Sequence, residues 1–209
     1  MSETIKRSRI AGCRDIYTAR VTQNDEDGYV AGTPMKLART IRMKITENWE
    51  EQKIYSDDGT EEVISSYSGT DVELEVNALA PQDRKQIFDQ LYKNGYLARS
   101  ADDIQPELAL GWRERRLNGL YEFHWMYCGK FAQGIEEESQ TKEGSPNPQT
   151  RSLKGSFYER KKADTVDGKE KHLYQVDVDE GNLVDGNTDA KTAITKWFET
   201  VQEIGRAHV

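Results

Sequence analysis

The sequence predicts a mainly β protein, an antiparallel β-sandwich or barrel of roughly 8–10 strands with two flanking helices and one long protruding hairpin. Three observations lead to this fold class. Apolar and polar residues alternate with the two-residue period of strands along much of the chain. Asp-Gly and Asn-Gly pairs separate these alternating runs. Only two segments place their apolar residues at helical spacing.

The turn motifs fix where the expected hairpins reverse. Asn and Asp followed by Gly supply the positive φ angles that tight hairpin turns require. Such motifs lie at Asp25–Gly28, Asp57–Gly59, Asn118-Gly119 and Val166–Gly168. We therefore expect a hairpin tip at each of these places.

The hairpin around Asn118-Gly119 is the clearest in the chain. Because side chains alternate along a strand, each strand of this hairpin presents one apolar face. Before the turn that face holds Leu108, Leu110 and Trp112. After the turn, Tyr121, Phe123, Trp125 and Tyr127 share a face of their own strand. The aromatic row predicts core or interface packing, and stacking on sugars or bases is the alternative.

The segment TDVELEV, residues 70–76, is the most amphipathic strand in the sequence. One face carries Val72, Leu74 and Val76, and the other carries Asp71, Glu73 and Glu75. One apolar and one polar face are typical of an antiparallel sheet that packs on a core and meets water on its other side.

Two helices are expected. The first, APQDRKQIFDQLYKNG, starts at Pro81 and stops at Asn94-Gly95, with a buried stripe of Ile87, Phe88, Leu91 and Tyr92. The second, TDAKTAITKWFETV, has Thr188 or Asp189 as its cap. Its apolar residues at helical spacing are Ala190, Ala193, Ile194, Trp197, Phe198 and Val201.

The chain predicts a single domain over residues 1–202, because it has no repeat, low-complexity tract or interdomain linker. Polar residues 1–9 predict a flexible N-terminal arm without the apolar core of a signal peptide. Residues 203–209 follow no periodic pattern and read like a sequencing adapter translated in frame, so we expect them outside the fold. No apolar run has the ~20 residues of a membrane span, which predicts synthesis and retention in a cytoplasm.

Composition argues against several classes of function. The formal net charge of −8 disfavours sequence-independent binding of nucleic acid, which needs a basic surface. Cys13 and Cys128 are the only cysteines and have no CxxC spacing, so neither a disulfide framework nor a zinc site is expected. No metal or other cofactor is therefore predicted.

The acidic segment SDDGTEE, residues 56–62, is the first place to look for chemistry. A calcium loop of the EF-hand type needs oxygen ligands five, three and one residues before its glycine. Those positions hold Ile54, Ser56 and Asp58, and isoleucine offers no oxygen ligand in its side chain. Adjacent carboxylates at a hairpin tip are instead typical of an ordinary turn.

No other catalytic motif is present. The chain contains no GxSxG elbow, P-loop, GxGxxG or HExxH sequence. His124 and His172 each stand alone in alternating strands, which indicates structural or surface histidines rather than ligands or general bases. We therefore expect no catalytic residues and no enzyme activity. Many strand edges without an active site favour a self-associating building block.

Four segments, taken in order, resemble a known family. They are IAGCRDIYTARVTQNDEDGYVAGTPMKLA, IYSDDGTEE, ALGWRERRLNGLYEFHWMYCGKF and TKWFETV. Between Ile10 and Val201 this ordered set resembles the major tail proteins of long-tailed bacteriophages. The polar first forty residues and the EIGRAHV end depart from that pattern.

The resemblance implies a tail-tube subunit built on a β-sandwich or barrel flanked by a helix. Such subunits form six-membered rings that stack into a hollow tube through which the phage genome passes. The implied partners are further copies of the chain and other tail proteins, namely the tail tip, tape measure and terminator proteins. Viral DNA would pass without specific binding, and no membrane is involved. The implied location is the virion tail, after synthesis in the bacterial cytoplasm.

Carried onto this sequence, the resemblance makes the hairpin from about Ile41 to Tyr67 an arm that reaches a neighbouring subunit or ring. Its tip is Ser56, Asp57, Asp58, Gly59, Thr60 and Glu61. Its length and polarity fit an arm that is ordered by contact, because an isolated hairpin is only marginally stable.

Carboxylates that face the axis of such a tube would repel phosphate and let DNA slide. The first candidates are Asp71, Glu73 and Glu75, and the second are Glu136–Glu138. An ordinary solvated outer face is the alternative for these acids. Two other functions also remain: a monomeric carbohydrate-binding module that uses the Tyr121–Tyr127 aromatics, and the tube of a phage-like bacteriocin or injection device.

Overall fold

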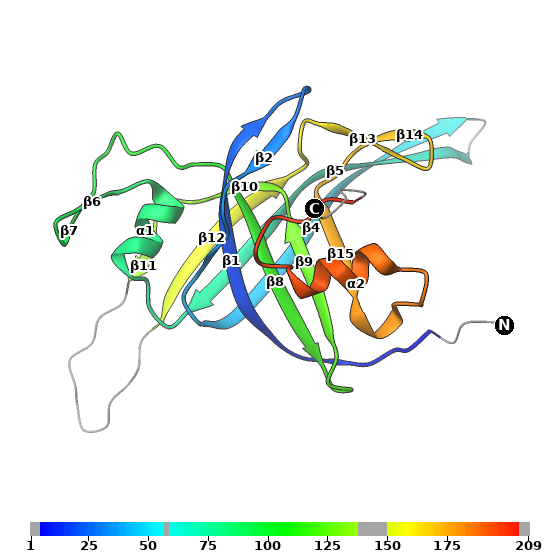
Figure 1. Ribbon diagram of the computed structural model, residues 1–209. Coiled ribbons are helices and arrows are strands. Elements are labelled where there is room, and N and C mark those ends of the chain that lie inside the picture. Colours follow the sequence, from blue (N-terminus) through cyan, green and yellow to red (C-terminus); the bar gives the residue numbers. More distant parts are fainter. Residues whose placement is uncertain (1–4, 57–58, 138–149, 205–209) are drawn as a thin grey trace, which may run out of the picture.

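The computed structural model describes residues 5–56, 59–137 and 150–204, and it is mainly β, with antiparallel curled sheets and two α-helices. Two sheets pack face to face, and α2 lies on the side away from the second sheet (Figure 1). The predicted fold class is therefore confirmed. The described part of the chain contains fifteen strands, more than the roughly 8–10 predicted. The difference arises because many of these strands are only two to four residues long.

One sheet, which we call the central sheet, has the strand order β15-β9-β8-β1-β2, with β3 also paired to β1. Its strands are β1 (Ile10–Asn24), β2 (Tyr29–Ala31), β3 (Met35–Lys36), β8 (Leu108–Arg116), β9 (Tyr121–Met126) and β15 (Gln175–Asp179). The other, which we call the outer sheet, has the order β10-β12-β5-β4, with β11 paired to β12. Its strands are β4 (Thr40–Ser56), β5 (Gly59–Val76), β10 (Cys128–Phe131), β11 (Glu136–Glu137) and β12 (Arg151–Tyr158).

The main core lies between the two sheets. Val72, Leu74 and Val76 of β5 face inward and are at most 1% exposed, as the alternation in TDVELEV predicts. From the central sheet, Leu108, Leu110 and Trp112 of β8 face them. Burying such side chains is worth roughly 1.5–3 kcal/mol each, so this layer fixes the register of both sheets.

A second core covers the opposite face of the central sheet. It contains Ala109 of β8, Phe123, Trp125 and Tyr127 from β9 and its end, and Trp197 after α2. Trp125 donates its Nε1–H to the Trp197 carbonyl oxygen at 2.9 Å, and Trp197 donates to the His124 carbonyl oxygen at 3.2 Å. The central sheet is thus buried on both faces, which gives three layers in all.

Trp125 reaches this second core across Gly111, its cross-strand partner in β8. A Cβ atom at position 111 would lie 2.7 Å from three ring carbons of Trp125, which is fully buried. We expect Gly111→Ala to reduce the free energy of unfolding by about 1–3 kcal/mol, because the indole must shift in a filled core. Denaturant titration tests this, with Gly12→Ala as the control, since a Cβ there meets nothing within 4 Å. Equal effects of the two variants would contradict this account of the packing.

The first helix is shorter than predicted. α1 (Pro81–Phe88) ends where Asp89 takes a left-handed conformation with φ of 56°. The chain then forms the hairpin of β6 (Leu91–Lys93) and β7 (Tyr96–Ala98), and Asn94-Gly95 is its turn rather than a helix stop. Ile87 and Phe88 are buried as expected, but Leu91 is 62% exposed, so its place in the buried stripe was wrong.

The second helix also ends early. α2 (Thr188–Thr195) has Asn187 as its N-cap rather than Thr188 or Asp189, and no side chain caps it. Trp197 and Val201 are buried as their spacing suggests, but they follow the helix in an irregular segment. Helical periodicity therefore identified Trp197 and Val201 as buried residues but overestimated the length of the helix.

The hairpin predictions at Asp25–Gly28, Asn118-Gly119 and Val166–Gly168 are confirmed by the pairs β1–β2, β8–β9 and β13 (Ala163–Val166)–β14 (Lys169–His172). The segment TDVELEV is the second half of β5, so the hairpin of β4 and β5 is longer than the predicted one. In Figure 1 this hairpin runs diagonally across the body and projects beyond it.

Both ends of the described chain contact the body. The Lys6 backbone N–H donates to Asn182 Oδ1 at 2.8 Å, and the Arg9 carbonyl oxygen accepts from Leu117 at 2.9 Å. Glu203 lies within the segment expected outside the fold, yet its carboxylate bonds Arg160 Nη1 at 2.7 Å, and Arg160 is fully buried. No helix in the described part of the chain is long and apolar enough to cross a membrane.

Candidate functional site

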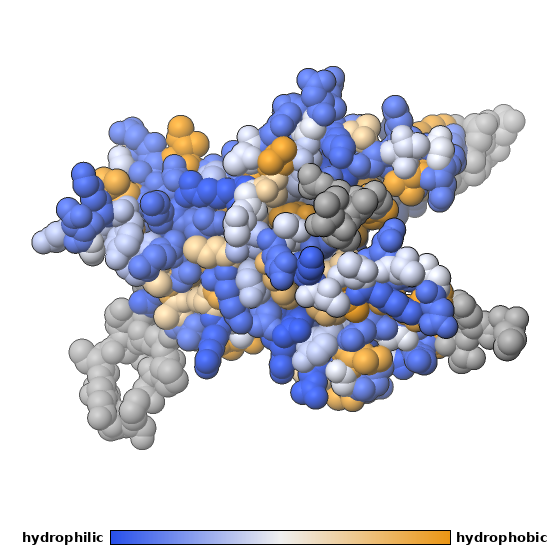
Figure 2. All heavy atoms as spheres, viewed as in Figure 1, coloured by the Kyte–Doolittle hydropathy of each residue, from blue (hydrophilic) through white to orange (hydrophobic). Residues whose placement is uncertain are grey.

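The projecting part of the β4–β5 hairpin, residues 49–66 apart from the tip, is the most conspicuous candidate for a contact surface. We call it the arm. It exposes Trp49, Val63 and Ile64 at 50%, 50% and 46%, and Ile54 at 37%. Figure 2 shows hydrophobic patches beside hydrophilic ones on the projecting hairpin. Because a lone two-stranded hairpin is only marginally stable, the exposed apolar groups on it make the arm a candidate contact surface.

The arm is anchored to the body by three aromatic rings at its base. Trp49 of β4 packs edge-to-face on Tyr67 of β5, with ring centroids 5.5 Å apart. Tyr67 in turn stacks on Tyr174, just before β15, at 4.2 Å. The Tyr67 hydroxyl also hydrogen-bonds to Thr70 at 2.8 Å. A shift in register between Asn48 and Trp49 marks the start of the arm, because β-bulges bend and twist the strand that carries them.

The predicted tip is only partly visible. Ser56 ends β4 and pairs with Gly59, and Thr60 pairs with Tyr55, so the backbones of these residues belong to the arm. Asp57 and Asp58 lie outside the described residues, as do the side chains of Thr60 and Glu61. What the tip contacts stays a prediction.

A second exposed apolar group lies at the other end of the molecule. The excursion of residues 89–107, which contains β6 and β7, exposes Leu91, Tyr96 and Ile104 at 62%, 81% and 79%. Figures 1 and 2 place this excursion on the side of the body opposite the arm. The two apolar ends suit a head-to-tail contact between copies, which would use both at once.

The predicted acids lie together on the outer face of the outer sheet. Asp71 and Glu73 are exposed, and Glu75 is half-buried. Asn48 and Ser156 each donate to the Asp71 carboxylate, at 2.9 and 3.0 Å. Thr150 donates to Glu75 at 2.7 Å. These neighbours hold the acids in a fixed row along β5.

Cations stand on both sides of this acidic row. Arg42 and Lys44 of β4 pair in register with Glu75 and Glu73, and Lys154 of β12 lies opposite Glu73 on the other side. Opposite charges directly across a sheet stabilise it by about 0.2–1 kcal/mol per pair. The face is therefore a mixed stripe of acids between cations, a pattern that the sequence of β5 alone does not reveal.

The second-choice acids are less well placed. Glu136 and Glu137 form β11, which pairs with β12 at the margin of the outer sheet. Their side chains, and Glu138 as a whole, lie outside the part of the chain that is described.

The outer sheet ends on both sides in strands that pair on one edge only, within the described residues. β4 pairs with β5 alone over its whole length, and β10 and β11 pair only with β12. A free edge exposes unpaired N–H and C=O groups, which can pair with a strand from another chain. The two free edges thus offer complementary places for a copy on each side.

The aromatic row offered as a sugar platform is not a surface. Phe123, Trp125 and Tyr127 are at most 6% exposed, because the segment around α2 and Trp197 covers them. Tyr121, which is half-buried, lies under the guanidinium of Arg113 at 4.5 Å. Packing, the reading preferred on the sequence, accounts for the row.

Two structural features were missed from the sequence because they join distant segments. Arg160 is fully buried under the Tyr127 ring at 4.3 Å, where it bonds Asp164 and Glu203. His124 comes close to carboxylates from two strands. For the cluster around His124, the sequence does offer one signal, the Glu-x-His spacing of Glu122 and His124 on one strand.

Comparison with known proteins does not identify a family for this chain. No protein-family model matches the sequence, and no curated protein matches it either.

Proposed function

We propose that this protein is a structural subunit that assembles with copies of itself, as the tail-tube subunit of a long-tailed bacteriophage. In this role it forms stacked rings through which viral DNA passes. It works without a catalytic step and contacts other tail proteins at the ends of the tube. The observation that carries the proposal is the outer sheet with two free edges and a long arm that exposes apolar side chains.

The free edges support lateral assembly. If β4 of one copy pairs with the β10–β11 margin of the next, the two open edges of the outer sheet satisfy each other. Repeating that contact closes a ring when a whole number of the rotations between neighbouring copies makes a full turn. The resemblance of the four sequence segments to phage tail proteins favours the same arrangement.

The arm supports assembly along the axis. Its apolar side chains, above all Trp49 and Val63, lie on a hairpin that projects from the body, where a neighbouring copy can cover them. The exposed Leu91, Tyr96 and Ile104 at the opposite end supply apolar area of the same kind. Contacts between unlike ends do not close, so they extend rings into a tube.

A concentration series tests the proposal. Purified protein is examined from micromolar to millimolar concentration by sedimentation velocity and negative-stain electron microscopy. We expect rings or tubes to appear as the concentration rises. A protein that stays monomeric throughout this range, with its sheet edges still free, would contradict the proposal.

The acidic row gives a separate prediction about the passage of DNA. We expect Asp71→Asn, Glu73→Gln and Glu75→Gln together to leave assembly intact, because amides keep the shape of the acids and one of their two acceptor oxygens. The remaining Arg42, Lys44 and Lys154 would then make this face basic, so assembled tubes should retain DNA at low salt. Co-sedimentation with DNA measures this, with amides at Glu50, Glu51 and Glu62 of the arm as the control. Equal retention by both variants would place the acids away from the passage.

A further inference from the structure

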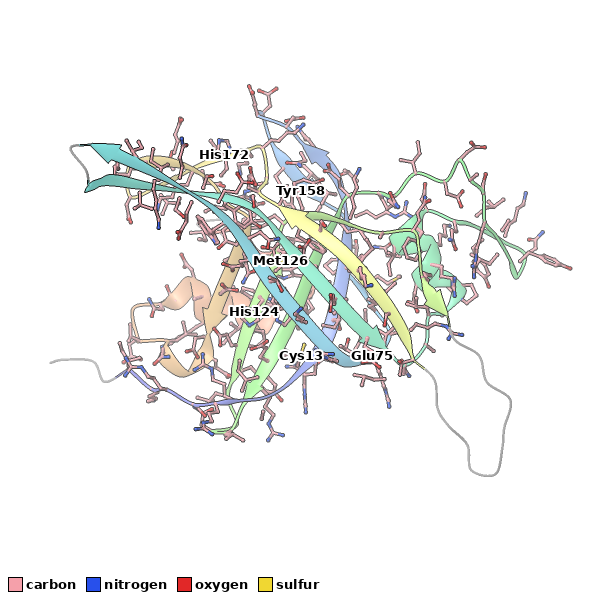
Figure 3. The ribbon with its side chains drawn as sticks, turned by 180° about the vertical axis from the view of Figure 1, so that it is seen from behind. Cys13, Glu75, His124, Met126, Tyr158 and His172 are labelled. Carbon is pink, nitrogen blue, oxygen red and sulfur yellow. The ribbon has the colours of Figure 1, made fainter. Side chains whose placement is uncertain are left out.

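Three potential metal ligands meet at the central sheet, on the face that is turned toward the outer sheet. Glu114 of β8 and Glu122 and His124 of β9 each bring one ligand atom within 4.8 Å of the others. Register places Glu114 directly opposite Glu122, and Trp112 opposite His124. Figure 3 labels His124 and Cys13 along the lower edge of the crossing β4–β5 ribbon, and Cys13 packs against the main core. The cluster thus lies near one end of the main core rather than on the outside.

His124 is held rigidly in this cluster. It is 7% exposed, and its ring stacks on Trp112 with centroids 4.7 Å apart and planes 14° apart. Its Nδ1 is 2.6 Å from Asp177 Oδ1 on β15. Gln175 donates to the same carboxylate oxygen at 2.7 Å, which holds Asp177 in place. A carboxylate accepts hydrogen bonds, so this contact puts the imidazole proton on Nδ1.

The other ring nitrogen is then a free, buried acceptor. With the proton on Nδ1, Nε2 carries a lone pair, and Nε2 has no hydrogen-bond partner among the described residues. Buried polar atoms are rarely left unpaired, because an unpaired one destabilises the fold, so such an atom points to a missing partner. A carboxylate cannot serve, because it has no proton to donate when ionised. A cation can.

The charge around His124 suits a divalent cation. Three carboxylates lie close to the ring, those of Glu114, Glu122 and Asp177. A fourth, that of Asp179, shares the guanidinium of Arg116 with Glu122. Arg116 bonds both Glu122, at 2.5 Å, and Asp179, at 3.0 Å, which orients Glu122. With a neutral imidazole, the four carboxylates and the one guanidinium carry a net charge of −3. A divalent ion would offset most of that charge in a half-buried place.

We propose that Glu114, Glu122 and His124 bind one divalent transition-metal ion, for which zinc is the best match, with Asp177 as the residue that positions His124. Imidazole nitrogen and carboxylate oxygen are both zinc ligands, at about 2.0–2.2 Å. Ligands that far from one ion lie at most about 4.2 Å apart, so a small rotation of one glutamate completes the site. The hydrogen bond from Nδ1–H to Asp177 is the outer support that metal-bound histidines commonly have.

Isothermal titration of the unassembled protein with zinc chloride tests the proposal. We expect one site per chain, lost in His124→Gln and weakened at least tenfold in Glu114→Gln. Asp177→Asn should weaken binding by about 10- to 100-fold without removing a ligand, because it disturbs the tautomer and orientation of His124. Cobalt chloride gives a second measurement, since visible absorption bands report the nitrogen and oxygen ligands directly.

Two matched variants separate this site from other zinc ligands in the chain. His172 is exposed on β14, so His172→Gln should bind zinc as the unchanged protein does. Cys13 lies on β1 in register with Glu114, so Cys13→Ser excludes a thiol as the source of binding. Circular dichroism confirms that each variant is folded. Binding that survives His124→Gln and Glu114→Gln in folded protein, or that is lost in His172→Gln, would overturn the proposal.

The proposal goes beyond the assembly function and does not depend on it. Zinc binding is measured on single chains, so a failure to bind leaves tube formation untouched. Conversely, a chain that never assembles can still bind the ion. Magnesium chloride is titrated in parallel, and binding as tight as that of zinc would contradict the assignment to a transition metal, because magnesium prefers oxygen ligands and water.

Discussion

Shortening the arm should abolish tube formation and leave the subunit folded. The simplest shortened variant deletes Ser56–Glu61, but only Tyr55 then remains between the two strands to form the turn. Ile54 and Glu62 are paired in register, so replacing residues 55–61 with Asn-Gly closes the hairpin on a two-residue turn. Negative-stain microscopy should show no tubes at concentrations where the unchanged protein forms them. The melting temperature should change little, because the arm lies outside both cores.

A variant of unchanged length separates reach from tip chemistry. Asp57→Asn with Asp58→Gly keeps the length of the hairpin and removes two of the three tip carboxylates. Tubes formed by this variant but not by the shortened one would show that the length of the arm is what matters. Tubes formed by the shortened variant would refute the role assigned to the tip, because the shortening leaves Trp49, Ile54 and Val63 in place.

Trp197→Ala should be the most destabilising single substitution tested. Trp197 is 2% exposed, packs against Phe123 with centroids 5.6 Å apart and hydrogen-bonds the His124 carbonyl. Removing its indole leaves a cavity over the central sheet and removes the hydrogen bond to the His124 carbonyl oxygen. We expect a loss of about 3–5 kcal/mol in the free energy of unfolding, measured by denaturant titration.

Lys196→Ala is the matched control, because Lys196 is the exposed neighbour in the same segment. Its effect should stay within about 0.5 kcal/mol. If Trp197→Ala cost no more than this control, the segment after α2 would not be the cover of the second core. The subunit would then have two layers that matter for stability rather than three.

The sequence predicted the fold class because its signals are local. Turn pairs such as Asn118-Gly119 and the alternation in residues 70–76 act within a few residues, and both are confirmed. The helix boundaries were wrong for a reason that is not local. Asn94-Gly95 suits a helix stop and a hairpin turn equally well, and only the pairing of Leu91 with Ala98 decides between them.

The charged stripe and the cluster around His124 were harder to predict from the sequence. Asp71, Glu73 and Glu75 were placed on one face correctly, but their cationic neighbours come from β4 and β12, and β12 lies about eighty residues away in the sequence. The cluster around His124 likewise needs β8, β9 and β15 to be adjacent. Periodicity identifies which side chains share a face of one strand, but strand order determines which strands share a sheet.

The order of the layers gives the subunit a direction. On one side lies the charged stripe of the outer sheet, and on the other lies the segment around α2, with the central sheet covered between them. Copies related by rotation about an axis must all turn the same side toward it. Any closed ring of this chain would therefore have chemically distinct inner and outer walls, and antibodies or proteases applied to intact particles would reach only one of them.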